Sequence, residues 1–479
     1  MSGTWTSFGG DLHLDLTERR AGGVGLRAAL EDALREAVQD GRLAPGTRLP
    51  SSRALGEDLG IARNTVVEAY GQLTAEGWLS SRQGSGTIVT ERSVHCEEVR
   101  HSAVRPGAQR RSVRHDLMSG SPDLSTFPRT AWLAAARRAL ATAPHEAFGY
   151  GSPMGRIELR EALTRYLARV RGVRTDPDHL LICTGVSQGF GLLCAALRER
   201  GVRTLAVEEY GLQSQHAAAR AAGLAVRPLP LDCDGARTEG LHEGDGAVLL
   251  TPAHQYPTGA ALSAERRAAA VGWARARNGY IVEDDYDGEF RFDRQPLGAM
   301  QALDPARVVY AGTAAKSLAP GLRLAWLALP DELVEPVARL KTRADTMSPV
   351  LDQLTLAELI TSGTYDRHVR RCRLHYRRRR DRLVAALAEH APHVRVTGIA
   401  AGLHVVIRLP ADSVTEAELT ARAEAAGLGL SGLDWHRAEA GGEPDPEPGL
   451  VIGYATPPEH AFPAALGALC ELLRSTRGA

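Results

Sequence analysis

The stretch Gly312-Thr313-Ala314-Ala315-Lys316-Ser317-Leu318-Ala319-Pro320-Gly321-Leu322-Arg323 contains one of only two lysines in a chain of 479 residues. The other 55 of the 57 basic residues are arginines (57 − 2). A lysine amine can lose its proton and form a Schiff base with an aldehyde, which a guanidinium cannot do. Arg323 follows seven residues later, and its planar fork suits a phosphate. The pair predicts a site for pyridoxal 5′-phosphate (PLP), although from this stretch alone Lys316 is equally compatible with an ordinary surface lysine.

Short apolar runs surround this stretch and alternate with helical segments. Such alternation predicts an α/β domain with a mostly parallel sheet from residue 115 onward. The runs cover residues 180–183, 204–207, 247–250, 280–282 and 308–310.

Composition limits the classes of protein to which the chain can belong. The formal net charge is zero and 44% of the residues are hydrophobic, so any binding to nucleic acid must come from a local patch. The six cysteines form no Cys-x-x-Cys pair, which predicts a reducing cytoplasm and no metal site. We find no signal-peptide pattern and no apolar run long enough to cross a membrane, so we expect no membrane partner.

Three segments differ in character. Residues 10–90 are rich in helical patterns and end in a Gly/Ser turn. Residues 91–114 contain six arginines, three glutamates and few apolar residues, which predicts a basic, flexible linker. Residues 115–479 carry the α/β pattern. We therefore expect two domains joined by a linker.

The N-terminal segment has the pattern of a helix-turn-helix. Residues 25–39 have helical apolar spacing, Ser51 or Ser52 can cap a second helix that ends near Gly60, and a third helix begins near residue 61. Two short helices joined by a tight turn are typical of this motif. Arg63 and Asn64 lie at the start of the third helix, where a recognition helix presents side chains to base edges. Residues 78–89 predict a β-hairpin wing.

The stretch LPSSRALGEDLGIARNTVVEAYGQLTAEGWLSSRQGSGTIV resembles the winged helix of the GntR superfamily. The resemblance implies contacts with double-stranded DNA, with Arg48 reaching a phosphate. The alternative is a winged helix that contacts protein. The residues implied in DNA binding are Arg48, Ser52, Arg53, Arg63, Asn64, Thr65, Arg82, Gln83 and Gly84.

Four motifs of the C-terminal segment support a PLP site. Residues 281–286 end a predicted strand in acids and a tyrosine, so a carboxylate there could keep the pyridine nitrogen protonated. Residues 184–190 join a strand to a helix whose N-terminus could seat a phosphate. Residues 251–259 form a turn, in which His254 and Gln255 either contact a ligand or stabilise the turn, and residues 150–155 precede a helix.

The order and spacing of these motifs resemble a fold-type I aminotransferase over residues 115–475. The resemblance implies that Lys316 forms the internal aldimine, which is the Schiff base with PLP. It also implies that Tyr150 reaches the partner's cofactor across a dimer interface. The remaining implied contacts are Asp284 to the pyridinium, Tyr286 and Tyr256 to the ring hydroxyl, and Ser187, Gln188 and Arg323 to the phosphate. The acids Glu283, Asp285 and Asp287 are expected to be structural.

Both modules together resemble the MocR/GabR family of transcriptional regulators. The resemblance implies a cytoplasmic homodimer that binds an operator and responds to PLP itself or to an amine or amino acid. Three positions depart from the family pattern: Ala314-Ala315 replaces Phe-Ser, Leu212 stands where an aromatic residue usually stacks on the ring, and residues 449–454 lack a carboxylate-binding arginine.

Several alternatives remain open at the level of sequence. The chain could be a working aminotransferase with an accessory DNA-binding module, or a regulator with an empty PLP site. A run of nine arginines between Arg367 and Arg382 predicts either a solvated helix or a basic patch that supports DNA. Since four of these arginines are consecutive, we expect that they cannot all be buried.

Overall fold

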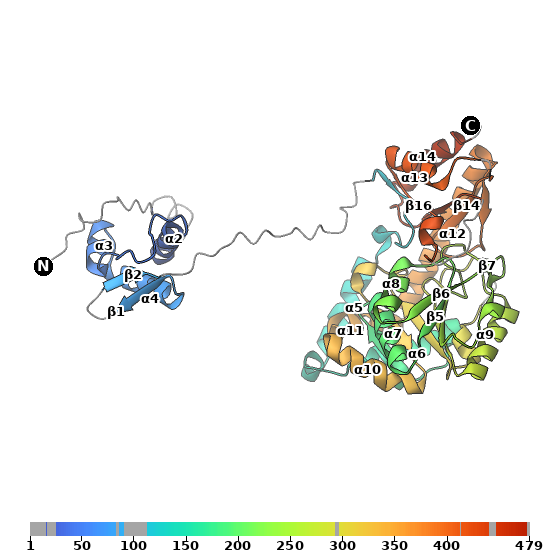
Figure 1. The fold of residues 1–479 in the computed structure, drawn as a ribbon, viewed down its shortest axis with the longest axis horizontal. Coiled ribbons are helices and arrows are strands. Elements are labelled where there is room, and N and C mark those ends of the chain that lie inside the picture. Colours follow the sequence, from blue (N-terminus) through green and yellow to red (C-terminus); the bar gives the residue numbers. More distant parts are fainter. Residues whose placement is uncertain are drawn as a thin grey trace. The chain divides into compact units, whose positions relative to one another are not determined.

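The computed structural model of this protein describes residues 16, 25–82, 86–90, 113–292, 297–411, 413–439 and 447–476. Backbone contacts divide the chain into two compact units, Met1–Gln109 and Arg110–Ala479 (Figure 1). All but the last two residues of the expected linker 91–114 lie outside the described residues.

The N-terminal unit contains the three predicted helices and the predicted hairpin. The hydroxyl of Ser51 accepts a hydrogen bond from the Ala54 amide and so caps the second helix. Leu34, Val66 and Leu73 are buried in one core, because each helix places its apolar residues on one face. The elements are α2 (Leu26–Gln39), α3 (Ser52–Asp58), α4 (Arg63–Ala75) and the antiparallel strands β1 (Leu79–Arg82) and β2 (Gly86–Val89).

The C-terminal unit is built around a seven-stranded sheet, which confirms the predicted mostly parallel α/β fold. All strands run parallel except β12, which is antiparallel to both of its neighbours. The strand order is β4 (Leu180–Cys183), β12 (Ala325–Ala328), β11 (Val308–Thr313), β10 (Tyr280–Asp284), β9 (Ala247–Leu250), β5 (Thr204–Glu208) and β6 (Ala225–Leu229).

Helices cover both faces of this sheet, which explains why its strands are continuous apolar runs. In β4, Leu181 packs on one face with residues of α7 (Val186–Glu199) and α10 (Asp331–Asp345). Ile182 packs on the other face with residues of α6 (Ile157–Arg171) and α11 (Val350–Thr361). Further helices of the unit are α5 (Arg129–Thr142), α8 (Gln213–Ala221) and α9 (Ala264–Arg277).

Two strands of the sheet, β6 and β12, are absent from the sequence prediction. Strand β6 contains Arg227 and Pro228, and it lies at the edge of the sheet, where a missing amide donor is tolerated. Strand β12 reads Ala-Trp-Leu-Ala, a composition that suits a helix as well as a strand. Its pairing with β11 and β4 decides its conformation.

A second, four-stranded antiparallel sheet forms the upper layer of this unit in Figure 1. Beside it β3 (His115–Asp116), the first strand after the linker, pairs with β15 (Leu428–Gly429). The sheet contains β13 (Arg395–Thr397), β14 (Val405–Arg408), β17 (Gly449–Ile452) and β16 (Ser431–Gly432), and its helices are α12 (Thr364–His390), α13 (Glu416–Ala425) and α14 (Phe462–Arg474).

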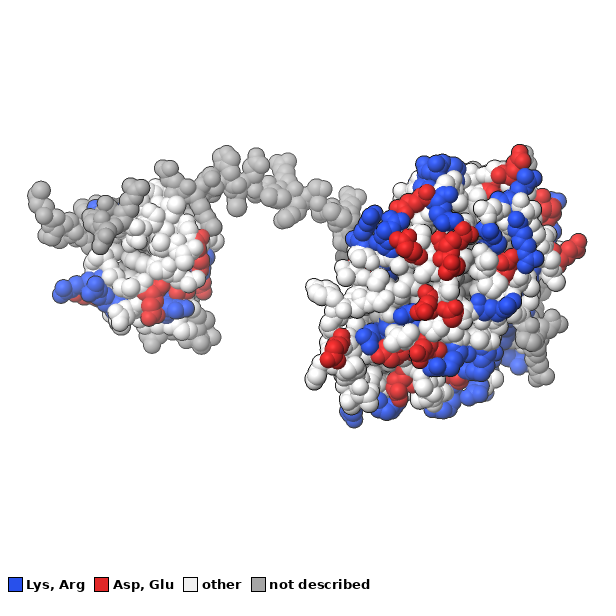
Figure 2. All heavy atoms as spheres, turned by 90° about the horizontal axis from the view of Figure 1, so that it is seen from below, with Lys and Arg blue, Asp and Glu red and all other residues white. Residues whose placement is uncertain are grey.

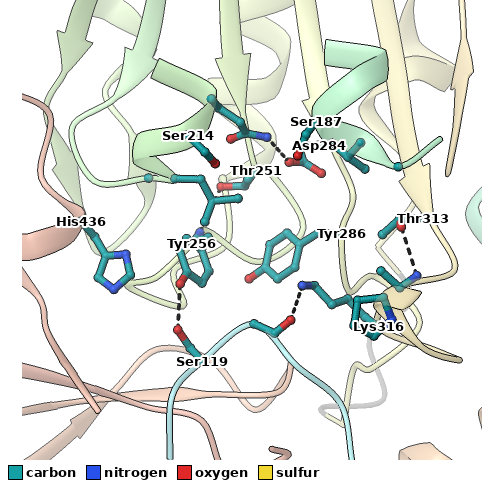
Figure 3. Close-up of a pocket in the computed structure, with 18 of the residues that line it drawn as sticks. Ser119, Ser187, Ser214, Thr251, Tyr256, Asp284, Tyr286, Thr313, Lys316 and His436 are labelled. Atoms are coloured by element: carbon teal, nitrogen blue, oxygen red, sulfur yellow. Dashed lines mark hydrogen bonds between the residues drawn. The ribbon is translucent and has the colours of Figure 1, made fainter. Parts of the chain in front are cut away.

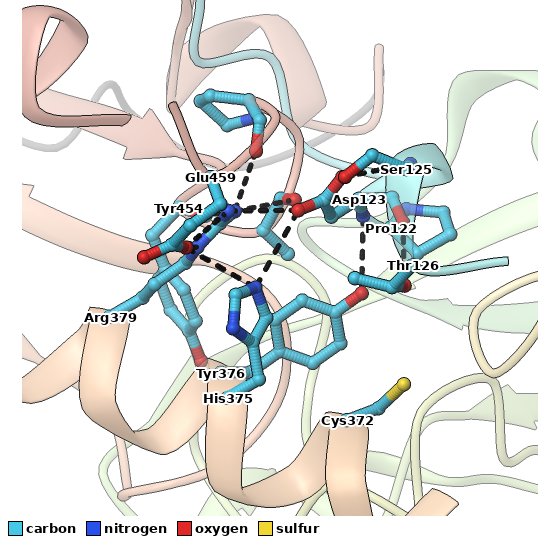
Figure 4. Close-up of polar contacts among 12 residues, drawn as sticks. Pro122, Asp123, Ser125, Thr126, Cys372, His375, Tyr376, Arg379, Tyr454 and Glu459 are labelled. Atoms are coloured by element: carbon cyan, nitrogen blue, oxygen red, sulfur yellow. Dashed lines mark hydrogen bonds and ion pairs between the residues drawn. The ribbon is translucent and has the colours of Figure 1, made fainter. Parts of the chain in front are cut away.

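The arginine run lies on α12, and its members have different environments. Arg378 is exposed, whereas Arg379 is only 1% exposed and pairs with Asp123 and Glu459 (Figure 4). The expectation that the run cannot be buried entirely is therefore confirmed. Basic and acidic side chains are interspersed over much of the face of this unit seen in Figure 2. Within the described part of the chain, no helix combines the length and apolar character needed to cross a membrane.

Candidate functional site

A cavity of about 370 Å³ lies where several parallel strands of the large sheet end. Glu208 ends β5, Asp284 ends β10 and Thr313 ends β11, and all three residues line the cavity. Figure 3 shows Asp284 and Thr313. Ligands of open α/β sheets bind at such strand ends. Six of the predicted cofactor residues line this cavity: Ser187, Tyr256, Asp284, Tyr286, Lys316 and Arg323.

Lys316 lies at one side of this cavity, shortly after the end of β11. Its amine donates a hydrogen bond to the carbonyl oxygen of Gly120. Burial lowers the pKa of Lys316 below its usual value, and the carboxylates of Asp284 and Asp287 oppose this shift. A lowered pKa increases the fraction of free amine, which is the form that can attack an aldehyde.

The first turn of α7 and Arg323 form a seat for a phosphate. Gly185 has φ 89°, and a Cβ atom there would lie 2.4 Å from Nη2 of Arg323, so only glycine leaves room for the guanidinium. Arg323 donates to the carbonyl oxygen of Thr184 at 2.9 Å. The helix N-terminus, Ser187 and this guanidinium together provide positive potential and donors for a dianion.

Asp284 has an oxygen that is not satisfied within the described protein. Its Oδ2 accepts a hydrogen bond from Gln215 at 2.7 Å, whereas its Oδ1 is buried without a partner. Burial raises the pKa of Asp284 to about 6, against the opposing effect of Gln215. A cationic nitrogen placed at Oδ1 would satisfy this carboxylate, as a protonated pyridine ring does.

The two tyrosines of the cavity are held by different partners. The hydroxyl of Tyr286 lies 3.0 Å from Nδ1 of His254, which in turn lies 2.9 Å from a carboxylate oxygen of Asp287. The hydroxyl of Tyr256 lies 2.8 Å from the hydroxyl of Ser119. His254 therefore positions Tyr286 from behind and does not line the cavity.

Two predicted cofactor residues do not line the cavity of this chain. The side chain of Gln188 accepts from the Thr184 amide and donates to Asp345, so it stabilises the turn before α7. Tyr150 is 95% exposed.

The neighbouring acids, expected to be structural, are engaged in the fold. Glu283 accepts hydrogen bonds from the amides of Met300 and Gln301. Asp285 forms a buried pair with Arg171 at 2.6 Å. Gln255, for which two roles were open, bonds the backbone of its own turn and Glu208.

Several residues of the cavity were absent from the sequence prediction. Ser119 and Gly120 come from the segment after β3, and His404, Trp435 and His436 come from the small-sheet layer. No local pattern marks them, because they reach the cavity only through the packing of distant segments.

These residues fit PLP. Lys316 would attach it, Asp284 would face its ring nitrogen, and Ser187, Gly185 and Arg323 would surround its phosphate. When bound, PLP supplies an aldehyde that combines reversibly with primary amines and a ring that withdraws electrons.

The first turn of α4 exposes the residues predicted to contact bases. Gly60 has φ 64° in the turn between α3 and α4, and Arg63 and Asn64 are exposed directly after it. Arg48 and Arg53 are exposed as well, and Thr65 and Ser52 are half-buried. The side chain of Arg82 and the predicted wing residues Gln83 and Gly84 lie outside the described part of the chain.

Two family models match the two units. Residues 26–89 match the gntR family of bacterial regulatory proteins, and residues 115–426 match aminotransferase class I and II. Solved aminotransferases have the fold of the larger unit. An archaeal alanine:glyoxylate aminotransferase has a TM-score of 0.68 at 24% identity and covers 75% of this chain and 91% of its own. The kynurenine aminotransferase of Pyrococcus horikoshii has a TM-score of 0.69 at 23% identity and covers 77% and 93%.

Curated relatives match across both units. The regulator YhdI of Bacillus subtilis is 33% identical over 81% of this chain and 84% of its own. The probable rhizopine catabolism regulatory protein MocR of Rhizobium meliloti is 31% identical over 90% of both chains. The pyridoxine biosynthesis regulator PdxR of Corynebacterium glutamicum is 31% identical over 89% of this chain and 91% of its own. PLP is the cofactor of the aminotransferase class I and II fold, and GntR-type domains bind DNA operators. The chain therefore belongs to the MocR-type transcriptional regulators, in which a gntR-family DNA-binding domain is joined to an aminotransferase-like PLP domain.

Proposed function

We propose that this regulator senses PLP, or an amine that reaches PLP, through Lys316, and that the response alters its binding to an operator. The observation that carries the proposal is the hydrogen bond from the Lys316 amine to Gly120. Once joined to PLP, the lysine nitrogen has fewer protons to donate, so this contact weakens. We take residues 10–90 as the DNA-binding domain, 91–114 as the linker and 115–479 as the sensing domain.

The segment around Gly120 connects the cavity to the start of the sensing domain. Met118, Ser119 and Gly120 line the cavity, and β3, just before them, follows the linker. On the other side of Gly120, Asp123 is held by Arg379 and its amide by Tyr376 (Figure 4). A displacement at Gly120 is proposed to pass toward β3, where the Met118 carbonyl oxygen accepts from Thr456 and β3 pairs with β15. Ligand binding shifts such an equilibrium only through unequal affinity for the two states.

Footprinting on DNA flanking the protein's own gene tests this function. We expect the wild-type footprint to change on addition of PLP, because PLP weakens the Lys316–Gly120 contact. Lys316→Met should bind the same DNA with and without PLP and give the same footprint in both conditions. A PLP-dependent footprint in that variant would contradict sensing through Lys316. Steady conversion of an amino acid and keto acid pair would instead support the rival function, a working aminotransferase.

A homodimer is the proposed assembly. Leu133 and Leu140 on α5 are 61% and 51% exposed, and Phe148 and Tyr150 nearby in the chain are 50% and 95% exposed. The left-hand side of the larger unit, where Figure 1 labels α5, shows few charged side chains in Figure 2. An exposed apolar surface of this kind indicates a protein interface. A dimer would present two winged helices to two half-sites separated by whole helical turns.

Two arginines of the DNA-binding domain are expected to act differently. Arg63 on α4 is proposed to contact a base edge, so Arg63→Ala should cost about 1–3 kcal/mol on the operator and relax discrimination at one position. Arg48 precedes α3 and is proposed to contact a phosphate. Arg48→Ala should therefore weaken binding to all DNA sequences alike, and it should lower by about one the slope of the logarithm of the binding constant against the logarithm of the salt concentration. Fluorescence anisotropy with operator and scrambled duplexes at several salt concentrations measures both. Full sequence discrimination by Arg63→Ala would contradict the placement of α4 in the major groove.

A further inference from the structure

The wall of the cavity that adjoins the small-sheet layer is aromatic. The ring of Tyr256 lies 5.2 Å from the rings of His404 and His436, in edge-to-face geometry with each. Figure 3 shows Tyr256 and His436. The ring of Trp435 lies 4.8 Å from that of His436 and is nearly perpendicular to it. Trp435 is 63% exposed, so this wall extends from the interior of the cavity to the solvent. Such a surface favours a flat, apolar or aromatic group.

His436 offers a hydrogen bond within this wall. Its side chain is 1% exposed, and its Nε2 lies 3.0 Å from the hydroxyl of Ser431. Its Nδ1 is buried and makes no hydrogen bond of good geometry within the described protein, although the backbone of Gly211 lies close enough to the ring to raise its pKa. A buried polar atom without a partner costs free energy, so a ligand group that pairs with Nδ1 would be favoured.

The wall does not carry the charge that a carboxylate needs. Among the described residues that line the cavity, Lys316 and Arg323 are the side chains with a lasting positive charge, and both are assigned to PLP. Burial lowers the pKa of His404 to about 3 and that of His436 to about 4, so both imidazoles are neutral at neutral pH. In β17, where a carboxylate-binding arginine was absent from the sequence, Leu450 and Ile452 are buried in the core.

We propose that the effector of this regulator is a primary amine that has an uncharged aromatic head with a hydrogen-bonding group and lacks a carboxylate, and that His436 recognises that group. This inference rests on the proposed function, because it requires PLP at Lys316. The effector's amino group replaces that of Lys316 at the aldehyde carbon: one C=N bond forms as the other breaks, and the lysine leaves as a free amine. No oxidation or reduction takes place. The aromatic head then lies against Tyr256 and Trp435.

Three amines that differ by one group each test the inference. Tyramine carries the phenol and no carboxylate, tyrosine adds the carboxylate, and phenethylamine lacks the phenol hydroxyl. Each is titrated into the PLP-loaded full-length protein, with the visible absorption band and calorimetric heat as readouts. We expect tyramine to bind at least about tenfold more tightly than tyrosine, because the carboxylate would be buried without a cation. We expect tyramine to bind about three- to tenfold more tightly than phenethylamine, as one hydrogen bond predicts.

Substitutions of His436 test whether this residue causes the preference for tyramine over phenethylamine. His436→Phe keeps the aromatic ring and should bring the ratio of the tyramine and phenethylamine affinities close to one. His436→Gln keeps a hydrogen-bonding group and should preserve part of the ratio, which covers the case that His436→Phe does not fold. His460→Phe, at an exposed histidine outside the cavity, is the matched control and should match the wild type.

Each other outcome overturns a defined part of the inference. Tyrosine binding as tightly as tyramine would overturn the exclusion of carboxylates, and an unchanged ratio in a folded His436→Phe would overturn the role of His436. If no amine alters the band while borohydride still fixes PLP on Lys316, the effector class is wrong and sensing of PLP itself stands. If borohydride fixes no PLP, the proposed function fails, and this inference fails with it.

Discussion

Lys316→Ala is expected to abolish the visible absorption of bound PLP and every borohydride-stable adduct of the protein. The amine of Lys316 lies in the same cavity as the unpaired carboxylate oxygen of Asp284 and the guanidinium of Arg323, which are expected to hold the two ends of the cofactor. An alanine cannot form the covalent link, so PLP could bind only through non-covalent contacts. Absorption spectra before and after borohydride reduction and dialysis measure the loss.

The second lysine provides the control within the same chain. Lys341 is fully buried on α10, and its Nζ lies 2.8 Å from Asp345 outside the cavity. Replacing it would leave the half-buried carboxylate of Asp345 without its lysine partner, so we expect peptide mapping of the reduced wild-type protein to be the sharper comparison. The adduct should be found on the peptide that contains Lys316 and not on the one that contains Lys341. A stable adduct in Lys316→Ala would refute the assignment.

Arg379→Met is expected to lower the free energy of unfolding of the larger unit by about 3–5 kcal/mol, because it leaves buried charge without a partner. Arg379 donates to Asp123 at 2.8 Å, to Glu459 at 2.9 Å and to the carbonyl oxygen of Pro457 at 2.6 Å (Figure 4). Asp123 is fully buried, and its remaining basic neighbour is His375, 3.5 Å away. Because methionine fills much of the volume of the arginine side chain, the decrease in the free energy of unfolding is attributed to the missing charge.

The adjacent arginine is the matched control for this substitution. Arg378 is exposed on the same helix, so Arg378→Met should change the free energy of unfolding by no more than about 0.5 kcal/mol. Urea unfolding followed by circular dichroism compares the two variants with the wild type. Equal midpoints for Arg379→Met and Arg378→Met would show that the buried network does not stabilise the unit.

Features that depend on neighbouring residues are encoded locally in the sequence. The cap at Ser51, the helical spacing of 25–39 and the apolar runs of β4, β9 and β10 follow from local chemistry, so they could be predicted. Lys316 and Arg323 could be assigned to one site because Arg323 follows Lys316 by only seven residues. These local signals predicted the two-part architecture, and together with the motifs at the strand ends and the family resemblance they predicted the cofactor.

Packing between distant segments of the chain determines which side chains complete the cavity. Gly120 precedes Lys316 by 196 residues, and Ser119 is separated from Tyr256 by 137 residues, yet each pair is joined by a hydrogen bond. Arg378 and Arg379 are adjacent arginines that the sequence does not distinguish, but of the two only Arg379 faces the buried carboxylate of Asp123. Such differences depend on which face of a helix packs against which segment, and contacts between segments far apart in the chain leave no periodic pattern in either one.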